Sequence, residues 1–209
     1  KPGWQEIVEV FMQAGQGLAA AHAAGLVHRD FKPANAMLGD DGRVRVLDFG
    51  LCYSNPTLDV LGEPRQGEVD VRLTRREEVV GTPAYMPPEQ FSGRFVGPAS
   101  DQFAFCVSLH EALYGQLPFP GDTVQELAHA VARGEVRDPP RGTRVPAWLH
   151  AVVLRGLRPD PRDRYPGMDA LLKALDRSHA LRRRTYAAAL GLAGVAAAFG
   201  FIAAKAQHA

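Results

Sequence analysis

The stretch His28-Arg29-Asp30-Phe31-Lys32-Pro33-Ala34-Asn35 decides how this sequence folds. Two further signatures follow it: Asp48-Phe49-Gly50, and the run 81–89 with the sequence Gly-Thr-Pro-Ala-Tyr-Met-Pro-Pro-Glu. Each one alone could be a polar turn that arises by chance. The three in this order, with the alternating pattern of a β-hairpin between the first two, are far more specific.

Together the three motifs resemble the catalytic half of a serine/threonine protein kinase. The resemblance implies that Asp30 orients the hydroxyl of the substrate and that Lys32 neutralises charge on the transferred phosphoryl group. Asn35 and Asp48 would supply oxygen ligands to Mg²⁺, a hard cation that prefers them. The implied cofactors are ATP and Mg²⁺. The implied substrates are proteins with Ser or Thr, because a lysine at position 32 is typical of serine/threonine kinases rather than tyrosine kinases.

Two residues near the first motif have a structural interpretation beside the functional one. Met37 falls where kinases of this type place an apolar residue under the adenine ring, which would make it cofactor-binding. A methionine there is more often simply a core residue, and the sequence alone does not separate the two interpretations. For His28 the structural interpretation is favoured, because in the family it packs near the phenylalanine that corresponds to Phe49. We therefore assign no catalytic role to His28.

Residues 51–80 correspond to the activation segment of such a kinase, and their Pro, Gly and mixed charges predict an exposed loop. The resemblance implies that Arg29 pairs with a phosphate on this loop and orders it. Thr74 is the candidate phosphosite, although an ordinary loop threonine explains it equally well. Thr82, in a Gly-Thr-x-x-Tyr pattern, is expected to organise the site by bonding the catalytic Asp and Lys.

Three residues are expected to stabilise the domain. Glu89 ends a Pro-Pro-Glu run that departs from the usual Ala-Pro-Glu, and the resemblance gives it Arg164 as a buried partner. Removing one member would leave a buried charge unpaired, at a cost of about 3–5 kcal/mol. Asp101 resembles the buried Asp that holds the catalytic loop by its backbone. A carboxylate in the first turn of a helix, favoured by the helix dipole, is the alternative.

The periodicity predicts a mainly α fold with a small β-hairpin, as in the large lobe of a protein kinase. Helices are expected over residues 4–24, 100–114, 123–133, 146–157 and 166–175, with a short buried strand at 26–27 and a hairpin over 36–46. The lobe covers residues 1–178. Composition is that of a globular protein, with 46% hydrophobic residues and a net charge of +1, which argues against an obligate nucleic-acid binder. The two cysteines have no metal or disulfide spacing and fit a reducing compartment.

The sequence contains no Gly-x-Gly-x-x-Gly loop and no Val-Ala-x-Lys strand, the parts that cover and hold the ATP phosphates in kinases. They would have to precede Lys1, so we expect the chain alone to be nearly inactive. A pseudokinase scaffold at the membrane and a small-molecule phosphotransferase of related fold are the alternatives. The retained catalytic residues argue against the first alternative, and the run 81–89 argues against the second.

The segment 186–204 is nineteen residues long and carries no charge. As a helix it would measure about 28 Å, close to the hydrocarbon thickness of about 30 Å. The basic segment 179–185 precedes it, so the positive-inside rule places the kinase lobe in the cytoplasm and residues 205–209 outside. A single span of the inner (cytoplasmic) membrane after the lobe resembles bacterial receptor-type kinases. A helix docked on another domain is the alternative. Gly194 and Ala198 would permit a homodimer.

Overall fold

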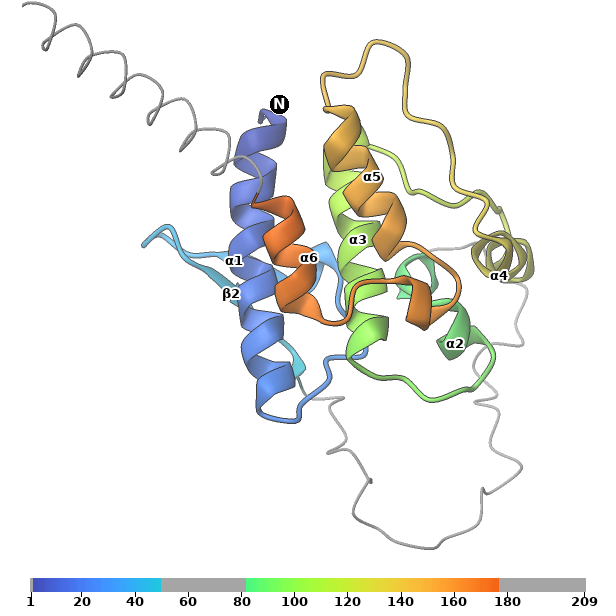
Figure 1. Cartoon of the computed structure of the whole chain (residues 1–209), viewed down its shortest axis with the longest axis horizontal. Helices are drawn as coiled ribbons and strands as arrows, with labels where there is room; N and C mark the ends of the chain where they lie inside the picture. Colours follow the sequence, from blue (N-terminus) through green and yellow to red (C-terminus); the bar gives the residue numbers. More distant parts are fainter. Residues whose placement is uncertain (1, 50–81, 177–209) are drawn as a thin grey trace, which may run out of the picture. The chain divides into compact units, whose positions relative to one another are not determined.

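Residues 2–49 and 82–176 are the part of the chain that the computed structural model describes (Figure 1). The chain forms two compact units, residues 1–172 and 173–209, and within the second only the end of the last helix is described. The elements in chain order are α1 (Trp4–Ala23), η1 (Pro33–Asn35), β1 (Ala36–Leu38), β2 (Val44–Val46), η4 (Thr82–Tyr85), α2 (Pro88–Phe91), α3 (Pro98–Tyr114), α4 (Val124–Arg133), α5 (Ala147–Gly156), η5 (Pro161–Asp163) and α6 (Met168–Leu175).

The core of the first unit lies where α1 packs on α3 (Figure 1). Every residue of α3 from Ser100 to His110 is buried, which is typical of a central helix rather than a surface helix. The ring of Phe11 on α1 meets Phe105 on α3 edge-on at 5.4 Å. Gly15 allows close packing here, because a Cβ there would lie 2.5 Å from the side chain of Leu172 and 3.3 Å from the ring of Phe105. The apolar stripe predicted for residues 4–24 is therefore the face that α1 turns to α3.

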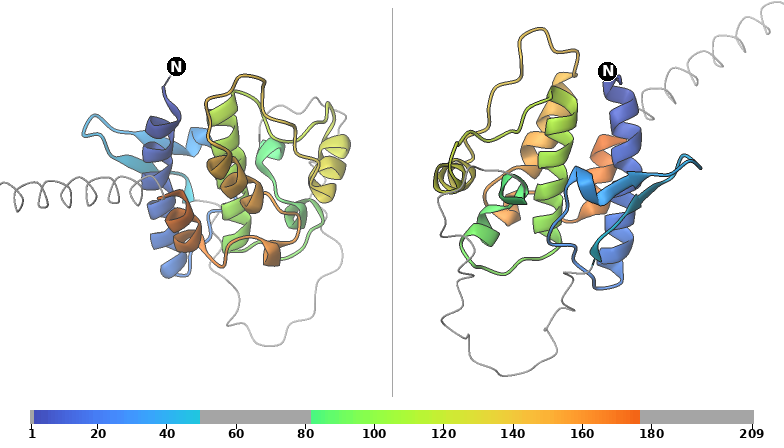
Figure 2. Two further views of the ribbon diagram at one scale, coloured as in Figure 1. Left: turned by 45° about the horizontal axis from the view of Figure 1, so that its top comes forward. Right: turned by 180° about the vertical axis from the view of Figure 1, so that it is seen from behind.

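The predicted hairpin is present and lies against α1 (Figure 2). Its two strands are antiparallel and pair Ala36 with Val46. Gly42 takes a left-handed φ of 72° in the turn, a conformation that costs glycine little. The side chain of Gln13 on α1 accepts a hydrogen bond from the backbone N–H of Val44 at 3.0 Å. The hairpin is thereby fixed to the helix next to the first sequence motif.

The predicted helices are present with shifted ends, but the predicted strand at 26–27 is wrong. The N–H of Leu26 donates to the carbonyl of Ala21 at 2.9 Å, so it closes the end of α1 instead of pairing with a strand. Gly25, with φ of 78°, allows this turn. Leu26 is also 39% exposed rather than buried. The short apolar pair was therefore misread, because a helix-closing turn also uses apolar residues.

The structure does not test the predicted membrane span. In the described ranges 2–49 and 82–176, no helix is both long enough and apolar enough to cross a membrane. The predicted span 186–204 and the basic segment 179–185 lie outside the described residues.

One close contact in the core yields a stability prediction. A Cβ on Gly156 of α5 would collide with the sulfur of Cys106 on α3, whose side chain is fully buried. Gly156→Ala should therefore lower the free energy of unfolding by about 1–3 kcal/mol, although alanine normally favours a helix. Urea unfolding followed by circular dichroism measures the effect.

Two further variants make this measurement decisive. Gly167→Ala is the matched control, because a Cβ there would meet no atom within 4 Å. Combining Gly156→Ala with Cys106→Ala should restore most of the lost stability, since it removes the sulfur that the new methyl group would meet. Equal stability of Gly156→Ala and Gly167→Ala would show that the two helices separate at little cost.

Candidate active site

A buried carboxylate holds the backbone of the first motif. Asp101, on the first turn of α3, is 1% exposed. Its two oxygens accept hydrogen bonds from the successive N–H groups of His28 and Arg29, each at 2.7 Å. The Nε2 atom of His22 lies 2.7 Å from the same carboxylate. The role expected for Asp101 is thus what its geometry provides, whereas a carboxylate acting only on its own helix would not reach this loop.

The loop formed by the first motif has an energetically unfavourable backbone conformation at Arg29, one of the two residues whose N–H groups Asp101 holds. Arg29 has a φ of 68°, in the left-handed region that residues with a Cβ rarely occupy. Such a conformation costs of order 1–3 kcal/mol and persists only where the surroundings impose it. Hydrogen bonds to a charged acceptor are among the stronger ones in proteins, and Asp101 supplies two to this turn. The clamp therefore sets the direction in which Asp30 leaves the backbone.

His28 links the first motif to the residue before the second motif through Nε2, and its Nδ1 holds the backbone of the first motif itself. Its Nε2 donates to the carbonyl of Leu47 at 2.8 Å, and its Nδ1 accepts from the N–H of Asp30 at 3.3 Å. These partners assign the neutral tautomer with the proton on Nε2. The ring lies 4.8 Å from the ring of Phe49. His28 is fully buried, and its contacts are those of a residue that joins two loops.

Three of the predicted site residues meet at the end of this loop. The ammonium of Lys32 donates to the carboxylate of Asp30 at 2.8 Å. The amide nitrogen of Asn35 donates to the carbonyl of Asp30, also at 2.8 Å. Asn35 is 5% exposed, whereas the side chains of Asp30 and Lys32 are 18% and 24% exposed. The carboxylate and the ammonium are therefore the members that a substrate can reach.

Asp48 is fixed beside this group by the residue before it. The N–H of Leu47 donates to the carbonyl of Asn35 at 2.8 Å, and Leu47 also accepts the bond from His28. Asp48 itself has a left-handed φ of 58°. The nitrogen of Asn35 is engaged by Asp30, which leaves its oxygen as the atom suited to a metal. Asn35 and Asp48 thus offer the oxygen donors that Mg²⁺ prefers.

This donor set fits Mg²⁺ rather than a metal held entirely by protein. No group of three or more His, Cys, Asp or Glu side chains suited to a metal occurs in the described residues. Mg²⁺ usually keeps several waters and is bound through one or two side chains together with the phosphates of the substrate. Two oxygen-bearing side chains beside the catalytic loop are sufficient for that type of site.

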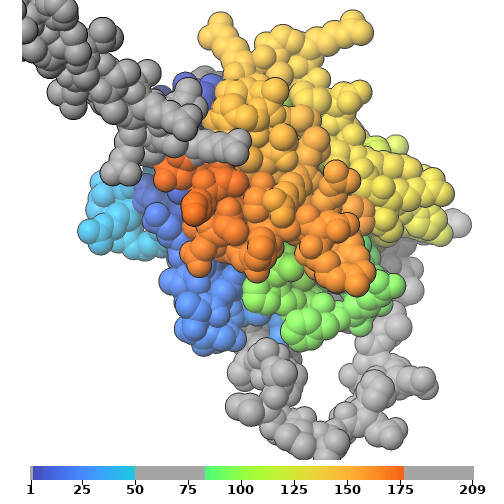
Figure 3. All heavy atoms as spheres, viewed as in Figure 1, coloured from blue at the N-terminus to red at the C-terminus, as the bar shows by residue number. Residues whose placement is uncertain are grey.

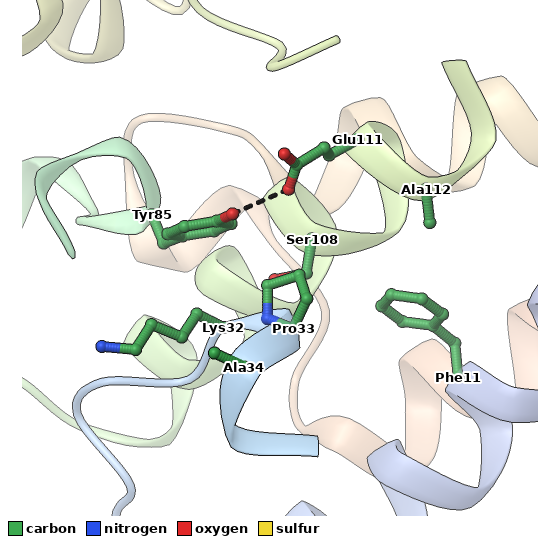
Figure 4. A pocket seen from close by; sticks show the side chains of 8 residues that line it. All are labelled: Phe11, Lys32, Pro33, Ala34, Tyr85, Ser108, Glu111 and Ala112. Carbon is green, nitrogen blue, oxygen red and sulfur yellow. Dashed lines mark hydrogen bonds between the residues drawn. The ribbon is translucent and has the colours of Figure 1, made fainter. Parts of the chain in front are cut away.

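A cavity of about 590 Å³ opens beside Lys32 (Figure 4). It is lined by residues from α1, the catalytic loop, η4 and α3, and Figure 4 shows the ring of Phe11 at one side of it. Tyr85 donates a hydrogen bond to the carboxylate of Glu111 at 2.7 Å. Burial, and then this bond to Glu111, raise the pKa of Tyr85 well above its usual value, so the phenol stays protonated. Lys32 thus borders both the carboxylate of Asp30 and a largely apolar cavity.

The ion pair expected between Glu89 and Arg164 is present and bidentate. The two terminal nitrogens of Arg164 donate to the two oxygens of Glu89 at 2.8 and 2.9 Å. Ser100 also donates to Glu89 at 2.8 Å, and the guanidinium lies over the ring of Phe103 at 4.9 Å. The pair connects α2, α3 and the η5 segment, so it ties the run 81–89 to the rest of the domain.

Other predicted residues have different outcomes. Met37 is 51% exposed on β1, so the core alternative is wrong for the described residues, and its contact with adenine stays a prediction. Thr74 lies outside the described residues, as does the side chain of Thr82, although η4 begins at that residue. Sequence reasoning missed His22 and Glu111. Helical spacing alone could not identify them, because their partners come from distant parts of the chain.

Comparison with known proteins identifies the family of this chain. The family profile described as Protein kinase domain matches residues 4–174. A protein of Corynebacterium efficiens named Serine/threonine-protein kinases drp72 is 34% identical over 168 residues, which are 80% of this chain and 29% of that protein. Serine/threonine-protein kinase Pkn1 of Myxococcus xanthus is 37% identical over 179 residues, 81% of this chain and 23% of the relative.

A third relative carries a different name. Tyrosine-protein kinase MasK of Myxococcus xanthus is 36% identical over 180 residues, 81% of this chain and 26% of that protein. The family profile covers most of the sequence, and the chain belongs to the protein kinase family. The chain spans less than a third of the length of each of these three relatives.

Proposed function

We propose that this chain carries the catalytic centre of a serine/threonine protein kinase, which transfers the terminal phosphoryl group of ATP to Ser or Thr hydroxyls of proteins. The observation that carries the proposal is the clamped loop, in which Lys32 reaches the carboxylate of Asp30 at 2.8 Å and Asn35 holds the carbonyl of Asp30. A scaffold without catalysis would not require this arrangement. The names of two of the three relatives support the same choice.

The residues act mainly by position and charge. Asp30 accepts the hydrogen bond of the substrate hydroxyl, orients its oxygen toward the terminal phosphorus and receives the proton as the new O–P bond forms. The bond from that phosphorus to the bridging oxygen breaks, and ADP leaves. Lys32 offsets negative charge on the transferred group. Asn35 and Asp48 would hold Mg²⁺, which supplies further charge neutralisation on the phosphates when bound.

The type of amino acid that carries the transferred phosphate in the product tests the proposed substrate class. We expect label from ATP with Mg²⁺ on phosphoserine and phosphothreonine of a generic basic protein, measured with the full-length protein. Lys32 supports this expectation, and one relative with a tyrosine kinase name gives the competing one. Label on phosphotyrosine alone would overturn the assignment of substrate class, while the phosphotransfer itself would stand.

A membrane-bound scaffold is the second candidate function. We expect the 209 residues by themselves to bind ATP weakly and to be nearly inactive. Absence of label with the full-length protein, despite measurable ATP binding, would favour the scaffold over the kinase.

We also propose membrane anchoring and control by phosphorylation. The uncharged segment 186–204, preceded by the basic segment 179–185, supports a single span with the kinase lobe in the cytoplasm. Extraction from membranes by alkaline carbonate would contradict it.

Arg29 beside Asp30 supports regulation by a phosphate on residues 51–80, with Thr74 as the candidate. Undiminished activity of Thr74→Ala would remove Thr74 from this role.

A further inference from the structure

A second cavity lies away from the catalytic loop, between the ends of α4 and α5. It measures about 300 Å³, and ten residues from the segments 133–138 and 150–159 line it: Arg133, Gly134, Val136, Arg137, Asp138, His150, Leu154, Leu157, Arg158 and Pro159. Figure 3 shows these segments side by side on one face of the molecule, in yellow and orange. We call it the α4–α5 pocket. Catalysis as described above uses none of its residues.

The walls of the α4–α5 pocket are fixed by the backbone. Gly134 ends α4 with a φ of 68°, and a Cβ there would lie 3.0 Å from the ring of Pro159. The N–H of Arg137 donates to the carbonyl of Pro118 at 2.7 Å. Gln116 donates from its side chain to the carbonyl of Asp138 at 3.3 Å. These bonds hold both sides of the pocket before any ligand arrives, which lowers the entropy that binding must overcome.

Apolar and basic side chains both line the α4–α5 pocket, and we call the aliphatic part of the lining its base and the charged part its rim. Val136, Leu154 and Leu157 contribute aliphatic surface, and Leu157 is 1% exposed. The rim carries the guanidinium groups of Arg133, Arg137 and Arg158. The stretch 133–164 contains eight arginines against four acidic residues, although the whole chain has a net charge of only +1. Positive charge is thus concentrated around this pocket.

Two of these arginines are available to a ligand. Arg133 is paired with Glu135 at 3.4 Å. Among the residues that the structure describes, neither Arg137 nor Arg158 forms an ion pair. The side chain of Arg137 makes one long hydrogen bond, at 3.5 Å, to the carbonyl of Leu117. The helix carbonyls that end α4 and α5 carry partial negative charge, so attraction of an anion depends on these two guanidinium groups.

We propose that the α4–α5 pocket docks an acidic segment of a protein substrate, with an apolar side chain on its base and carboxylates on Arg137 and Arg158. The proposal rests on the proposed function in assuming that the substrates are proteins. The guanidinium group of an arginine can bind a carboxylate through two parallel hydrogen bonds. Because the base is aliphatic, a ligand that also carries an apolar side chain fits the pocket better than a purely ionic ligand. The volume is at the small end for ligand sites, which suits one or two side chains. Asp138 also lines the pocket, and its negative charge would repel carboxylates that do not bind at the two arginines.

The test measures binding without ATP, so it does not depend on catalysis. A short fluorescent peptide of alternating Glu and Leu is titrated with the 209-residue chain, and anisotropy gives the affinity. Replacing Arg137 and Arg158 by Glu should weaken binding by about tenfold or more, because both attractions become repulsions. Peptides with Lys in place of Glu, or Ser in place of Leu, should bind more weakly to the unaltered chain.

The matched control replaces Arg141 and Arg144 by Glu. It makes the same change of charge on two exposed arginines of the same stretch that do not line the pocket. This control should keep the affinity, and circular dichroism should give the same unfolding curve for both double variants. Equal weakening by the two double variants would overturn the proposal in favour of general charge attraction. Binding to anionic lipid vesicles but not to the peptide would also overturn it.

Failure of this proposal and failure of the proposed function are distinguishable. A chain that binds the peptide through Arg137 and Arg158 but belongs to an inactive protein keeps the docking site and loses the kinase assignment. An active kinase whose peptide affinity is insensitive to these arginines keeps the assignment and loses the docking site. Should the double variant unfold, Leu154→Asn is the second test, since it should lower affinity for the Glu–Leu peptide and not for the Glu–Ser peptide.

Discussion

Asp30→Asn is expected to lower the rate of phosphoryl transfer by about 100- to 10,000-fold, the range typical of general acid–base groups. An amide keeps the shape of the side chain but can neither receive the proton of the hydroxyl nor carry the charge that Lys32 meets at 2.8 Å. The backbone carbonyl of Asp30, which Asn35 holds, is unchanged. The loss should therefore appear in kcat, with little change in the KM for ATP. Steady-state transfer of labelled phosphate by the full-length protein measures both constants.

Asp122→Asn is the matched control for this experiment. It makes the same chemical change at an exposed aspartate before α4, away from the catalytic loop, and should leave both constants unaltered. Both variants should also unfold at the same temperature as the unaltered protein. An Asp30→Asn protein with more than a tenth of the original kcat would remove Asp30 from the role of base. It would leave Lys32 and the metal ligands as the main contributors.

The residues of the catalytic loop were predictable because their order in the sequence is nearly their order in space. Asp30, Lys32 and Asn35 lie within six positions, and a loop of that length brings their side chains together. The hairpin that follows was equally local, since its turn and its alternating valines lie next to each other. The resemblance thus named the members of the site, and the local pattern predicted the hairpin beside them.

Other features depend on contacts between distant segments, which one sequence does not reveal. His22 and Asp101 are 79 positions apart, and neither has a motif that names the other. The bond from Tyr85 to Glu111 requires the packing of η4 on α3. The α4–α5 pocket requires the ends of two helices to meet. The strand predicted at 26–27 failed for a different reason: Leu26 bonds to Ala21 of the preceding helix, only five positions away, and a helix-closing turn also uses apolar residues.

The second large effect is expected at Arg164, whose replacement by alanine should lower the free energy of unfolding by about 3–5 kcal/mol. The side chain is fully buried and makes five hydrogen bonds. Two go to Glu89 and three go to the carbonyls of Arg158, Ala99 and Pro159. Removing it leaves a buried carboxylate and three partly buried carbonyls without this donor. Arg164→Lys should recover little, because an ammonium cannot reproduce the planar fork.

Arg162→Ala is the control for the loss of an arginine. Arg162 is paired with Asp160, but its side chain is 89% exposed, so its replacement should change stability by less than about 1 kcal/mol. The double replacement of Glu89 and Arg164 by alanine should cost less than the sum of the two single changes, since it leaves no unpaired charge. Additive losses would mean that the two side chains act separately and that the pair is not the source of the stability.

The pH dependence of unfolding gives an independent check on the same pair. Burial raises the pKa of Glu89, but the hydrogen bonds and the charge of Arg164 outweigh it, so the pKa lies below its ordinary value of 4.5. A carboxyl whose pKa is lowered by folding stabilises the protein above the ordinary pKa, and this stability is lost as the pH falls through the lowered pKa. The stability advantage of the unaltered protein over Glu89→Gln should therefore be largest at neutral pH and shrink below pH 4.5. Urea unfolding of both proteins across that pH range measures the difference in stability. If the stability advantage over Glu89→Gln grew in acid instead, Glu89 would be protonated in the folded protein and would donate a hydrogen bond to its partners.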